Sequence, residues 1–312
     1  MSFETLNLLG AKREPFLFIT DFKASSVEVI LLKDLEKEDI EFSIDKNFKL
    51  SSHKKSLKKE PIPFKEYKKK FDKVIDKISL GETYLLNLTA KTDIQTNLTL
   101  KEIYKLSSAY YKLRYKDNFV CFSPEKFIEI QSDRIDTHPM KGTIDSSVVD
   151  AKAKILADEK ETAEHIMVVD LLRNDLSIVA TDVRVEKFRY ITELDVGDKK
   201  LLQVSSHISG FVGANWHSRI GDILKSLLPA GSITGTPKKN TIKIIEEIEA
   251  YERDFFTGVF GVYDGERLDS GVMIRFIEKI GDNFVYKSGG GITIDSDVES
   301  EYNELIEKVY LP

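Results

Sequence analysis

The stretch from residue 258 to residue 291, GVFGVYDGERLDSGVMIRFIEKIGDNFVYKSGGG, contains three successive segments typical of β-strands. We expect strands over 258–263, 270–279 and 283–288, because β-branched and aromatic residues dominate these segments and turn residues separate them. Strands that follow one another in this way differ from the regular alternation of strand and helix that builds a doubly wound sheet. The stretch therefore favours an α+β fold.

The rest of the chain supports this fold class, because it predicts many strands and only a few long helices. Further strands are expected over 16–19, 27–32, 84–92, 118–122, 126–130, 183–185 and 201–208. Helices are expected from Tyr67 to a glycine cap at Gly81, and over 98–111, 147–175, 237–252 and the C-terminal residues after 300.

The length of 312 residues, with 41% hydrophobic residues, is sufficient for two domains or for one large β-rich domain. Residues 51–63 are rich in lysine and serine and end in Pro61-Ile62-Pro63, a composition that predicts a linker. We therefore expect an N-terminal region over 1–60 and the main domain over 61–312.

The formal net charge of -6 gives no electrostatic reason to expect a nucleic-acid partner. Lysines cluster around the expected linker, and we interpret this cluster as a solvated charge run. They are Lys54, Lys55, Lys58, Lys59, Lys68, Lys69 and Lys70.

Cys121 is the single cysteine, so the chain can form neither an internal disulfide nor a cysteine-based zinc site. It lies in the apolar run Phe119–Phe122, which indicates a core thiol. No segment of about 18 apolar residues is present to span a membrane, and the N-terminus lacks the pattern of a signal peptide. We expect a cytoplasmic protein without a membrane association.

Two glycine-rich segments suggest contacts with an anionic ligand. In GSITGTP (231–237), Thr236 and Pro237 predict a helix start, and exposed backbone amides there would suit a carboxylate or phosphate. The segment is not a nucleotide P-loop, and a plain strand–turn–helix connection is the alternative. In GGG (289–291), we predict either a loop that approaches a ligand or a tight hairpin.

Two pairs of glutamates are candidate metal ligands. Glu161 and Glu164 lie three residues apart on one expected helix, as do Glu301 and Glu304 on another. Carboxylate oxygens without cysteine or clustered histidine suit Mg²⁺, although most such pairs lie on solvated surfaces. Lys141, between Met140 and a glycine, is either an exposed turn residue or a desolvated amine whose lowered pKa makes it a nucleophile.

Several segments, taken together and in order, resemble the chorismate-utilising enzymes. This family includes the large subunits of anthranilate synthase and aminodeoxychorismate synthase, and the isochorismate and salicylate synthases. The resemblance covers residues 65–312. Its carrying segments are GETYLLNL (81–88), SPEKF (123–127), PMKGT (139–143), AEHIMVVDLLRND (163–175), PAGSITGTPK (229–238), Arg275, GGGI (289–292) and EYNE (301–304).

The resemblance implies a single domain of two large, mainly antiparallel β-sheets surrounded by helices, with the active site in a cleft between the sheets. Residues 1–60 look like a shortened version of the family's N-terminal region, packed on the core.

Within the family, Lys141 matches the lysine of aminodeoxychorismate synthases, whereas anthranilate synthases have alanine there. Leu85 stands where isochorismate and salicylate synthases carry a water-activating lysine, which disfavours hydration of chorismate. The resemblance thus implies component I of aminodeoxychorismate synthase, an enzyme of p-aminobenzoate and folate biosynthesis. An anthranilate synthase component I and a non-catalytic chorismate-binding subunit remain the alternatives.

The resemblance also implies roles for individual residues. Mg²⁺ would be held by Glu164 and Glu304, with Glu161 or Glu301. Lys141 would add covalently to the substrate ring, and Glu125 would act as the general acid. Backbone and side-chain contacts to the substrate carboxylates would come from Ser232, Ile233, Thr234, Gly235, Thr236, Arg275, Gly289, Gly290, Gly291 and Lys308.

Relatives often have histidine at the position of Leu202, so we assign no catalytic histidine to this chain. Ammonia would be supplied by a separate glutaminase subunit, because the chain contains no glutaminase-like region.

Overall fold

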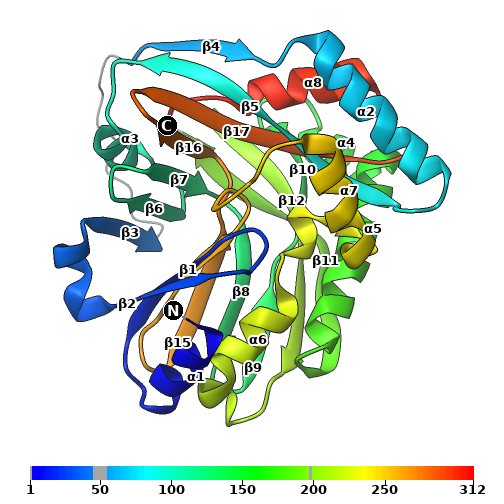
Figure 1. Ribbon diagram of the computed structural model, residues 1–312. Helices are drawn as coiled ribbons and strands as arrows, with labels where there is room; N and C mark the ends of the chain where they lie inside the picture. The colour runs from blue at the N-terminus through cyan, green and yellow to red at the C-terminus, as the bar shows by residue number, and fades with distance from the viewer. Residues whose placement is uncertain (1, 45–54, 197–198) are drawn as a thin grey trace.

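A computed structural model of the chain describes residues 2–44, 55–196 and 199–312 (Figure 1). Over these residues the strands form one nine-stranded and one eight-stranded sheet, and every strand pairing is antiparallel. The prediction of an α+β fold with two large antiparallel sheets is therefore confirmed.

The nine-stranded sheet has the order β10-β12-β9-β8-β15-β14-β1-β2, and β11 pairs with β12 outside this path. Its strands β1, β2, β8, β9 and β15 lie in the lower part of Figure 1. Its strands are β1 (Phe16–Thr20), β2 (Val27–Leu31), β8 (Lys126–Gln131), β9 (Arg134–Thr137), β10 (Met140–Asp145), β11 (Thr181–Val196), β12 (Lys199–Phe211), β14 (Val259–Tyr263) and β15 (Arg267–Val272).

The eight-stranded sheet has the order β13-β5-β17-β16-β7-β6-β3, and β4 pairs with β5. Its strands are β3 (Ile40–Ile44), β4 (Leu57–Pro61), β5 (Leu85–Thr96), β6 (Tyr111–Tyr115), β7 (Phe119–Ser123), β13 (Gly235–Thr236), β16 (Phe276–Ile280) and β17 (Asn283–Ile292). The predicted linker over 51–63 is wrong where the structure describes it, because β4 is hydrogen-bonded along β5. Residues 51–54 of that prediction lie outside the described residues.

Two of the places where the chain passes from one sheet to the other lie side by side. One joins β7 to β8, and the other joins β15 to β16. The Val272 N–H donates to the Glu125 carbonyl at 3.0 Å, and the Phe122 N–H donates to the Arg275 carbonyl at 3.2 Å. The single strand predicted over 270–279 is therefore two strands, separated by the crossing that carries Arg275.

The helices lie on the outer faces of the sheets and around their edges (Figure 1). The helix predicted over 147–175 is divided, because the side chain of Asp158 accepts a hydrogen bond from the Glu161 N–H and begins a new helix there. The bounds are α1 (Phe3–Ala11), η1 (Leu32–Glu38), α2 (Phe64–Ser79), α3 (Leu100–Leu106), α4 (Ala151–Ala157), α5 (Glu159–Ser177), η2 (Trp216–Arg219), α6 (Ile220–Leu227), η3 (Gly231–Ile233), α7 (Lys238–Glu249) and α8 (Val298–Glu307).

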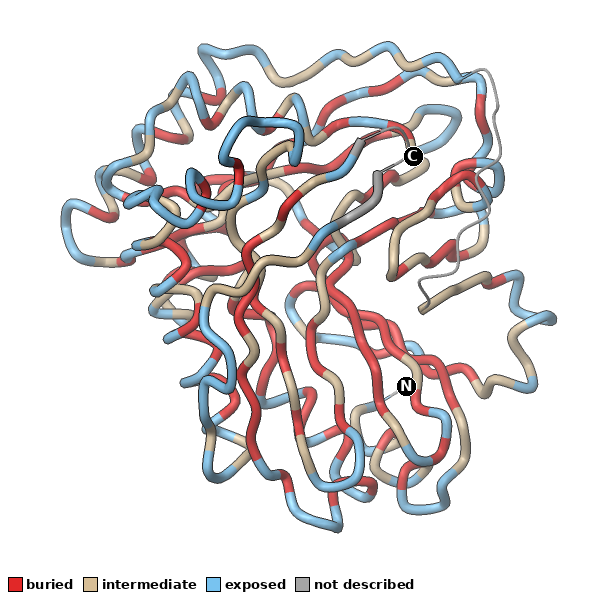
Figure 2. The backbone as a smooth tube through the Cα atoms, turned by 180° about the vertical axis from the view of Figure 1, so that it is seen from behind, coloured by how far each residue is buried: buried red, intermediate tan, exposed pale blue. Residues whose placement is uncertain are grey.

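The buried residues follow the strands, while exposed residues concentrate in the outer helices and the turns (Figure 2). The largest hydrophobic cluster joins strands of both sheets to α2, α5, α6 and α7, so the two sheets share one core. Cys121 is fully buried in β7, which confirms the expected core thiol. Among the described helices, none combines the length and apolar character that a membrane crossing requires.

Candidate active site

Lys141 projects from an irregularity in β10. Met140 pairs with Ser205 of β12 and Thr143 pairs with Gln203, so β10 has one more residue than its partner between these pairs. Gly142 has a φ of 88°, a left-handed conformation that glycine adopts without strain. A bulge of this kind redirects a side chain. Here the Lys141 Nζ lies 2.6 Å from the Glu164 Oε2 of α5.

Four carboxylates come together from two helices. Glu161 and Glu164 lie on α5, and Glu301 and Glu304 lie on α8. Glu164 and Glu301 are almost completely buried. Lysines compensate this charge: the Lys308 Nζ is 2.6 Å from a Glu304 oxygen, and the Lys160 Nζ is 4.0 Å from oxygens of both Glu164 and Glu301. The structure thus brings together the predicted acidic residues and Lys141.

Burial and mutual repulsion raise the pKa of two members of this acidic cluster. Burial raises the pKa of Glu161, and the charge of Glu164 adds to the effect although Lys141 opposes it. Burial likewise raises the pKa of Glu301, with a contribution from the Glu304 charge. The pKa of Glu304 is lowered, because Lys308 outweighs the effect of burial. A cation placed among these groups would relieve the repulsion.

The chemistry of this cluster suits a hard divalent cation. The Glu161 Oε2 is buried and accepts no hydrogen bond. A buried polar oxygen without a partner is uncommon and costs free energy. In the described part of the chain, no three acidic, histidine or cysteine side chains stand close enough together to hold a metal. One or two carboxylates with open positions are, however, what Mg²⁺ usually takes from a protein.

The electrostatic environment of Lys141 differs from the sequence-based expectation of a lowered pKa. Burial does lower the pKa of the Lys141 ammonium, but the neighbouring carboxylates of Glu164, Glu161 and Glu304 outweigh it, so the net shift is upward. The prediction failed because sequence spacing did not reveal that these carboxylates surround the amine.

Glu125 lies at the crossing from β7 to β8, where the Ser232 hydroxyl of η3 donates a hydrogen bond to its Oε1. Burial raises the pKa of the Glu125 carboxyl, against the opposing effects of Ser232 and of the positive charges of Arg275 and Lys308. The Arg275 Nε is buried without a hydrogen-bond partner. Glu125 thus combines the properties of a proton donor with two cations nearby that suit substrate carboxylates.

The predicted loop of three glycines is wrong, because Gly289, Gly290 and Gly291 lie in β17 and pair with β5. A Cβ added to Gly290 would lie 3.2 Å from the Glu301 Oε2 and 3.7 Å from the Lys308 Nζ. A Cβ on Gly289 would lie 2.5 Å from the Leu88 carbonyl oxygen. Gly289, Gly290 and Gly291 therefore place strand backbone next to Glu301 and Lys308. We call these three residues the glycine wall.

The helix predicted to start at Thr236 and Pro237 starts one residue later, at Lys238, and the predicted cap by the Thr236 hydroxyl is wrong. Gly235 and Thr236 form β13, the N-cap of α7 is Pro237, and no side chain caps that helix. Gly235 has a φ of 122°, and a Cβ there would lie 1.9 Å from the Leu85 carbonyl oxygen, so close packing on β5 requires this glycine. The hydroxyl of Thr234 donates to the Ala230 carbonyl. Ser232 is the residue of this segment that contacts another candidate site residue through its side chain.

In the first turn of α7, the Lys238 Nζ pairs with the Asp175 Oδ2 at 2.8 Å. Leu85 and Leu202 are both buried, in β5 and β12. Sequence reasoning missed Lys160, although its position four residues before Glu164 on the same helix is a recognisable ion-pair spacing.

Comparison with known proteins identifies the family of the chain. The chorismate binding enzyme family matches residues 19–311. The chain is 46% identical over 313 residues to an "Uncharacterized PabA-like protein" of Haemophilus influenzae, covering 99% of this chain and 95% of that protein. It is 30% identical to aminodeoxychorismate synthase component 1 of Bacillus subtilis, over 80% of this chain and 55% of that protein.

A solved structure, anthranilate synthase component I of Streptococcus pneumoniae, aligns with a TM-score of 0.70 at 25% identity. The alignment covers 81% of this chain and 58% of that protein. The family match over most of the chain and the sequence relatives show that the chain belongs to the chorismate-binding enzyme family.

Proposed function

We propose that this chain is the aminating subunit of aminodeoxychorismate synthase, which converts chorismate and ammonia to 4-amino-4-deoxychorismate. The observation that carries the proposal is the amine of Lys141, 2.6 Å from Glu164 and next to the acidic cluster. A lysine at this position distinguishes the aminodeoxychorismate synthases from the anthranilate synthases, which the sequence resemblance includes in the same family.

The substrate carries two carboxylates, and the site offers cations and backbone to receive them. Arg275, with its unpartnered buried Nε, would bind the enolpyruvyl carboxylate. Lys308 donates to the Gly289 carbonyl at 2.8 Å and so lies against the glycine wall. Gly290 leaves space between that wall and the α8 carboxylates.

The covalent sequence requires one nucleophile and one acid. The Lys141 ammonium would first pass a proton to the Glu164 carboxylate, which lies 2.6 Å away. The resulting neutral amine would add to ring carbon 2, the ring double bonds would shift, and the C4–O bond would break. Glu125 would give its proton to the departing oxygen, which leaves as water. Ammonia would then add at C4, and the reverse shift of the double bonds would release Lys141. The raised pKa of Glu125 supports its role, because the acid must be protonated at working pH.

Mg²⁺ would be held by Glu164 and Glu304, with Glu161 or Glu301 as further ligands. When bound, it would supply Lewis-acid polarisation of the ring carboxylate. The hard oxygen donors and the unpartnered Glu161 Oε2 support this cofactor. Glu164 would then serve both the metal and Lys141, whose Nζ contacts its Oε2.

We further propose that a separate glutaminase subunit supplies the ammonia and that the enzyme serves p-aminobenzoate and folate formation in the cytoplasm. The similarity to aminodeoxychorismate synthase component 1 supports this proposal.

The test is identification of the product from chorismate and an ammonium salt, with and without Mg²⁺. We expect 4-amino-4-deoxychorismate from the wild-type protein and none from Lys141→Ala. Lys152→Ala is the matched control, because Lys152 is an exposed lysine of α4 whose nearest acidic partner, Glu193, is 3.6 Å away. Anthranilate as the wild-type product would contradict the proposal and identify an anthranilate synthase instead.

Intact-protein mass spectrometry separates an enzyme from a non-catalytic binding subunit. Incubation with chorismate and Mg²⁺ but without ammonia should give a mass increase on wild type that is lost in Lys141→Ala. Chorismate binding without any product, and unaffected by Lys141→Ala, would indicate a non-catalytic subunit.

A further inference from the structure

Behind the glycine wall lies a buried ion pair that none of the proposed catalytic steps uses. The side chains of Glu249 in α7 and Arg253 are 0% and 1% exposed. Two hydrogen bonds join them, from the Arg253 Nη2 to Oε1 at 2.7 Å and from Nε to Oε2 at 2.8 Å. The guanidinium also lies over the ring of Phe22, 4.6 Å from its centroid. Both charges are therefore removed from water and held in one geometry.

This pair binds the backbone of two separate segments. The Arg253 Nη1 donates to the Ile233 carbonyl at 3.0 Å, and Nη2 donates to the Asn87 carbonyl at 2.6 Å. The Glu249 Oε1 accepts hydrogen bonds from both the N–H and the hydroxyl of Thr89, at 2.7 and 2.8 Å. One ion pair thus connects η3 to β5 through hydrogen bonds.

Both η3 and β5 lie directly next to the proposed site. Ile233 follows Ser232, whose hydroxyl contacts the general acid Glu125. On β5, Asn87 and Thr89 pair with Gly291 and Gly289 of the glycine wall. The ion pair therefore links the segment that contains Ser232 to the strand that pairs with the glycine wall.

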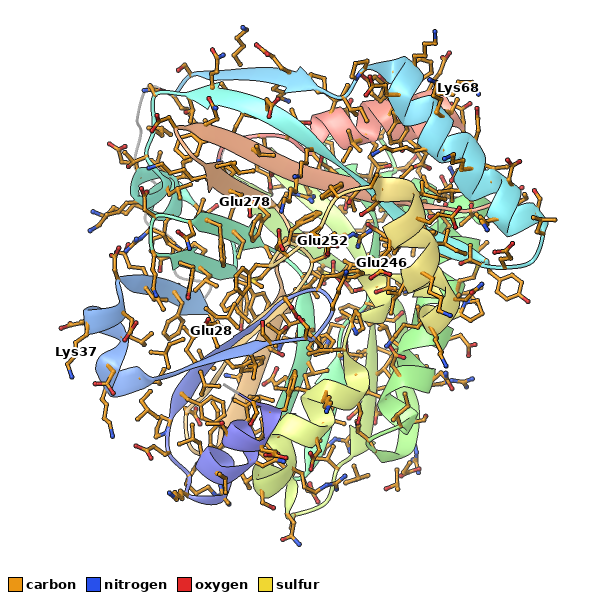
Figure 3. All side chains as sticks on the ribbon, viewed as in Figure 1. Glu28, Lys37, Lys68, Glu246, Glu252 and Glu278 are labelled. Carbon is orange, nitrogen blue, oxygen red and sulfur yellow. The ribbon has the colours of Figure 1, made fainter. Side chains whose placement is uncertain are left out.

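The same pair is also bonded to the next two strands of the sheet, β17 and β16. The Lys287 Nζ of β17 is fully buried, donates to the Arg253 carbonyl at 3.1 Å and pairs with Glu278 at 3.0 Å. Glu278 lies on β16 at the far end of this network (Figure 3). These bonds restrain the backbone of Arg253 as well as its side chain.

We propose that Arg253 and Glu249 are positioning residues, which set the geometry of the chorismate carboxylate site without touching the substrate. The inference rests on the proposed function. Stability alone is a weak reason for such a pair, because replacing buried ion pairs with apolar residues is often neutral or stabilising. The planar guanidinium, in contrast, can orient two carbonyls and a carboxylate at once, which lysine cannot do.

The test compares Arg253→Lys with Arg114→Lys. Arg114 of β6 is also buried, and its guanidinium also donates several hydrogen bonds at once. Its acceptors are Asp39, Glu41 and the Lys116 carbonyl, none of which belongs to the site. We expect both variants to lower the unfolding temperature. Only Arg253→Lys should raise the KM for chorismate, by about tenfold with kcat within about threefold, because misplacement of binding groups weakens substrate binding.

Equal KM values in Arg253→Lys and wild type, or an equal rise in Arg114→Lys, would overturn the inference while leaving the proposed function intact. A wild-type protein that makes no product overturns the function instead. Amide hydrogen exchange then tests the positioning role: exchange in 231–236 and 85–91 should accelerate in Arg253→Lys and not in Arg114→Lys. If Arg253→Lys does not fold, Glu249→Gln is measured in its place, with the same expected rise in KM.

Discussion

Replacing Gly290 by alanine tests whether the glycine wall serves the site or the fold. Gly290 lies in β17 opposite Leu88, and its φ is not in the left-handed region, so alanine is compatible with the backbone. The added Cβ would approach only the ends of side chains, 3.2 Å from the Glu301 Oε2, 3.7 Å from the Lys308 Nζ and 3.9 Å from the Glu304 Oε1. Each of these groups belongs to the proposed metal or substrate site.

The expected magnitudes follow from these contacts. Alanine in place of a strand glycine gains about 0.5–1 kcal/mol from reduced freedom of the unfolded chain. A flexible carboxylate that shifts by a few tenths of an ångström costs a similar amount, so the unfolding temperature should change by about 2 °C at most. Activity should fall about tenfold, because misplacement of about 1 Å in an active site can cost about a hundredfold.

Gly289→Ala is the matched control, since it adds the same methyl group one residue away. Its Cβ would lie 2.5 Å from the Leu88 carbonyl oxygen and 2.9 Å from the Thr89 Cα, both backbone atoms of β5. Overpacking of this kind typically costs about 1–3 kcal/mol, so this variant should be clearly less stable. Thermal unfolding and kcat/KM are measured for both variants. A Gly290→Ala protein with wild-type kcat/KM, or with lower stability than Gly289→Ala, would refute the reasoning.

Two further variants probe buried polar groups. Burial raises the pKa of Glu125 above its ordinary value of 4.5, so wild-type stability falls as pH rises from that value towards the higher pKa of the folded state. Glu125→Gln should therefore gain stability relative to wild type as pH rises above 4.5, by at most about 1.4 kcal/mol per pH unit. A free-energy difference from urea unfolding that stays the same at every pH would contradict this. Ser206→Ala should cost about 1–3 kcal/mol, because the Ser206 hydroxyl bonds the His165 Nε2 at 2.6 Å and accepts the Arg189 N–H. An unchanged urea midpoint would show that these groups find other partners.

The local sequence patterns predicted much of the secondary structure. The short-period strands at 16–19 and 126–130 are confirmed as β1 and β8, and the glycine stop at Gly81 follows α2 as expected. These features depend on residues close in the chain, whose side-chain periodicity and backbone preferences act locally. The boundaries were wrong where a long-range contact decides, as at β4, whose lysine-rich sequence forms a strand because β5 offers a free edge.

The proximity of the site residues to one another could not be predicted from local sequence patterns. The resemblance identified Lys141, Glu164 and Glu304 as neighbours, whereas their spacing in the chain alone left solvated surface as the more common outcome. The structure brings them together because a bulge directs Lys141 towards α5 and because α8 packs on β17. Neither the bulge nor the helix packing has a signature in the local sequence.

By itself, the sequence determined the fold class, the core position of Cys121 and the set of residues that carry the family's chemistry. Only the tertiary structure decided that the pKa of Lys141 is raised and that the three glycines form part of a strand. It also decided that Arg253 connects η3 to β5 by hydrogen bonds. The physical reason is that a pKa, a close backbone approach and a buried ion pair each depend on which distant groups the fold places within a few ångströms.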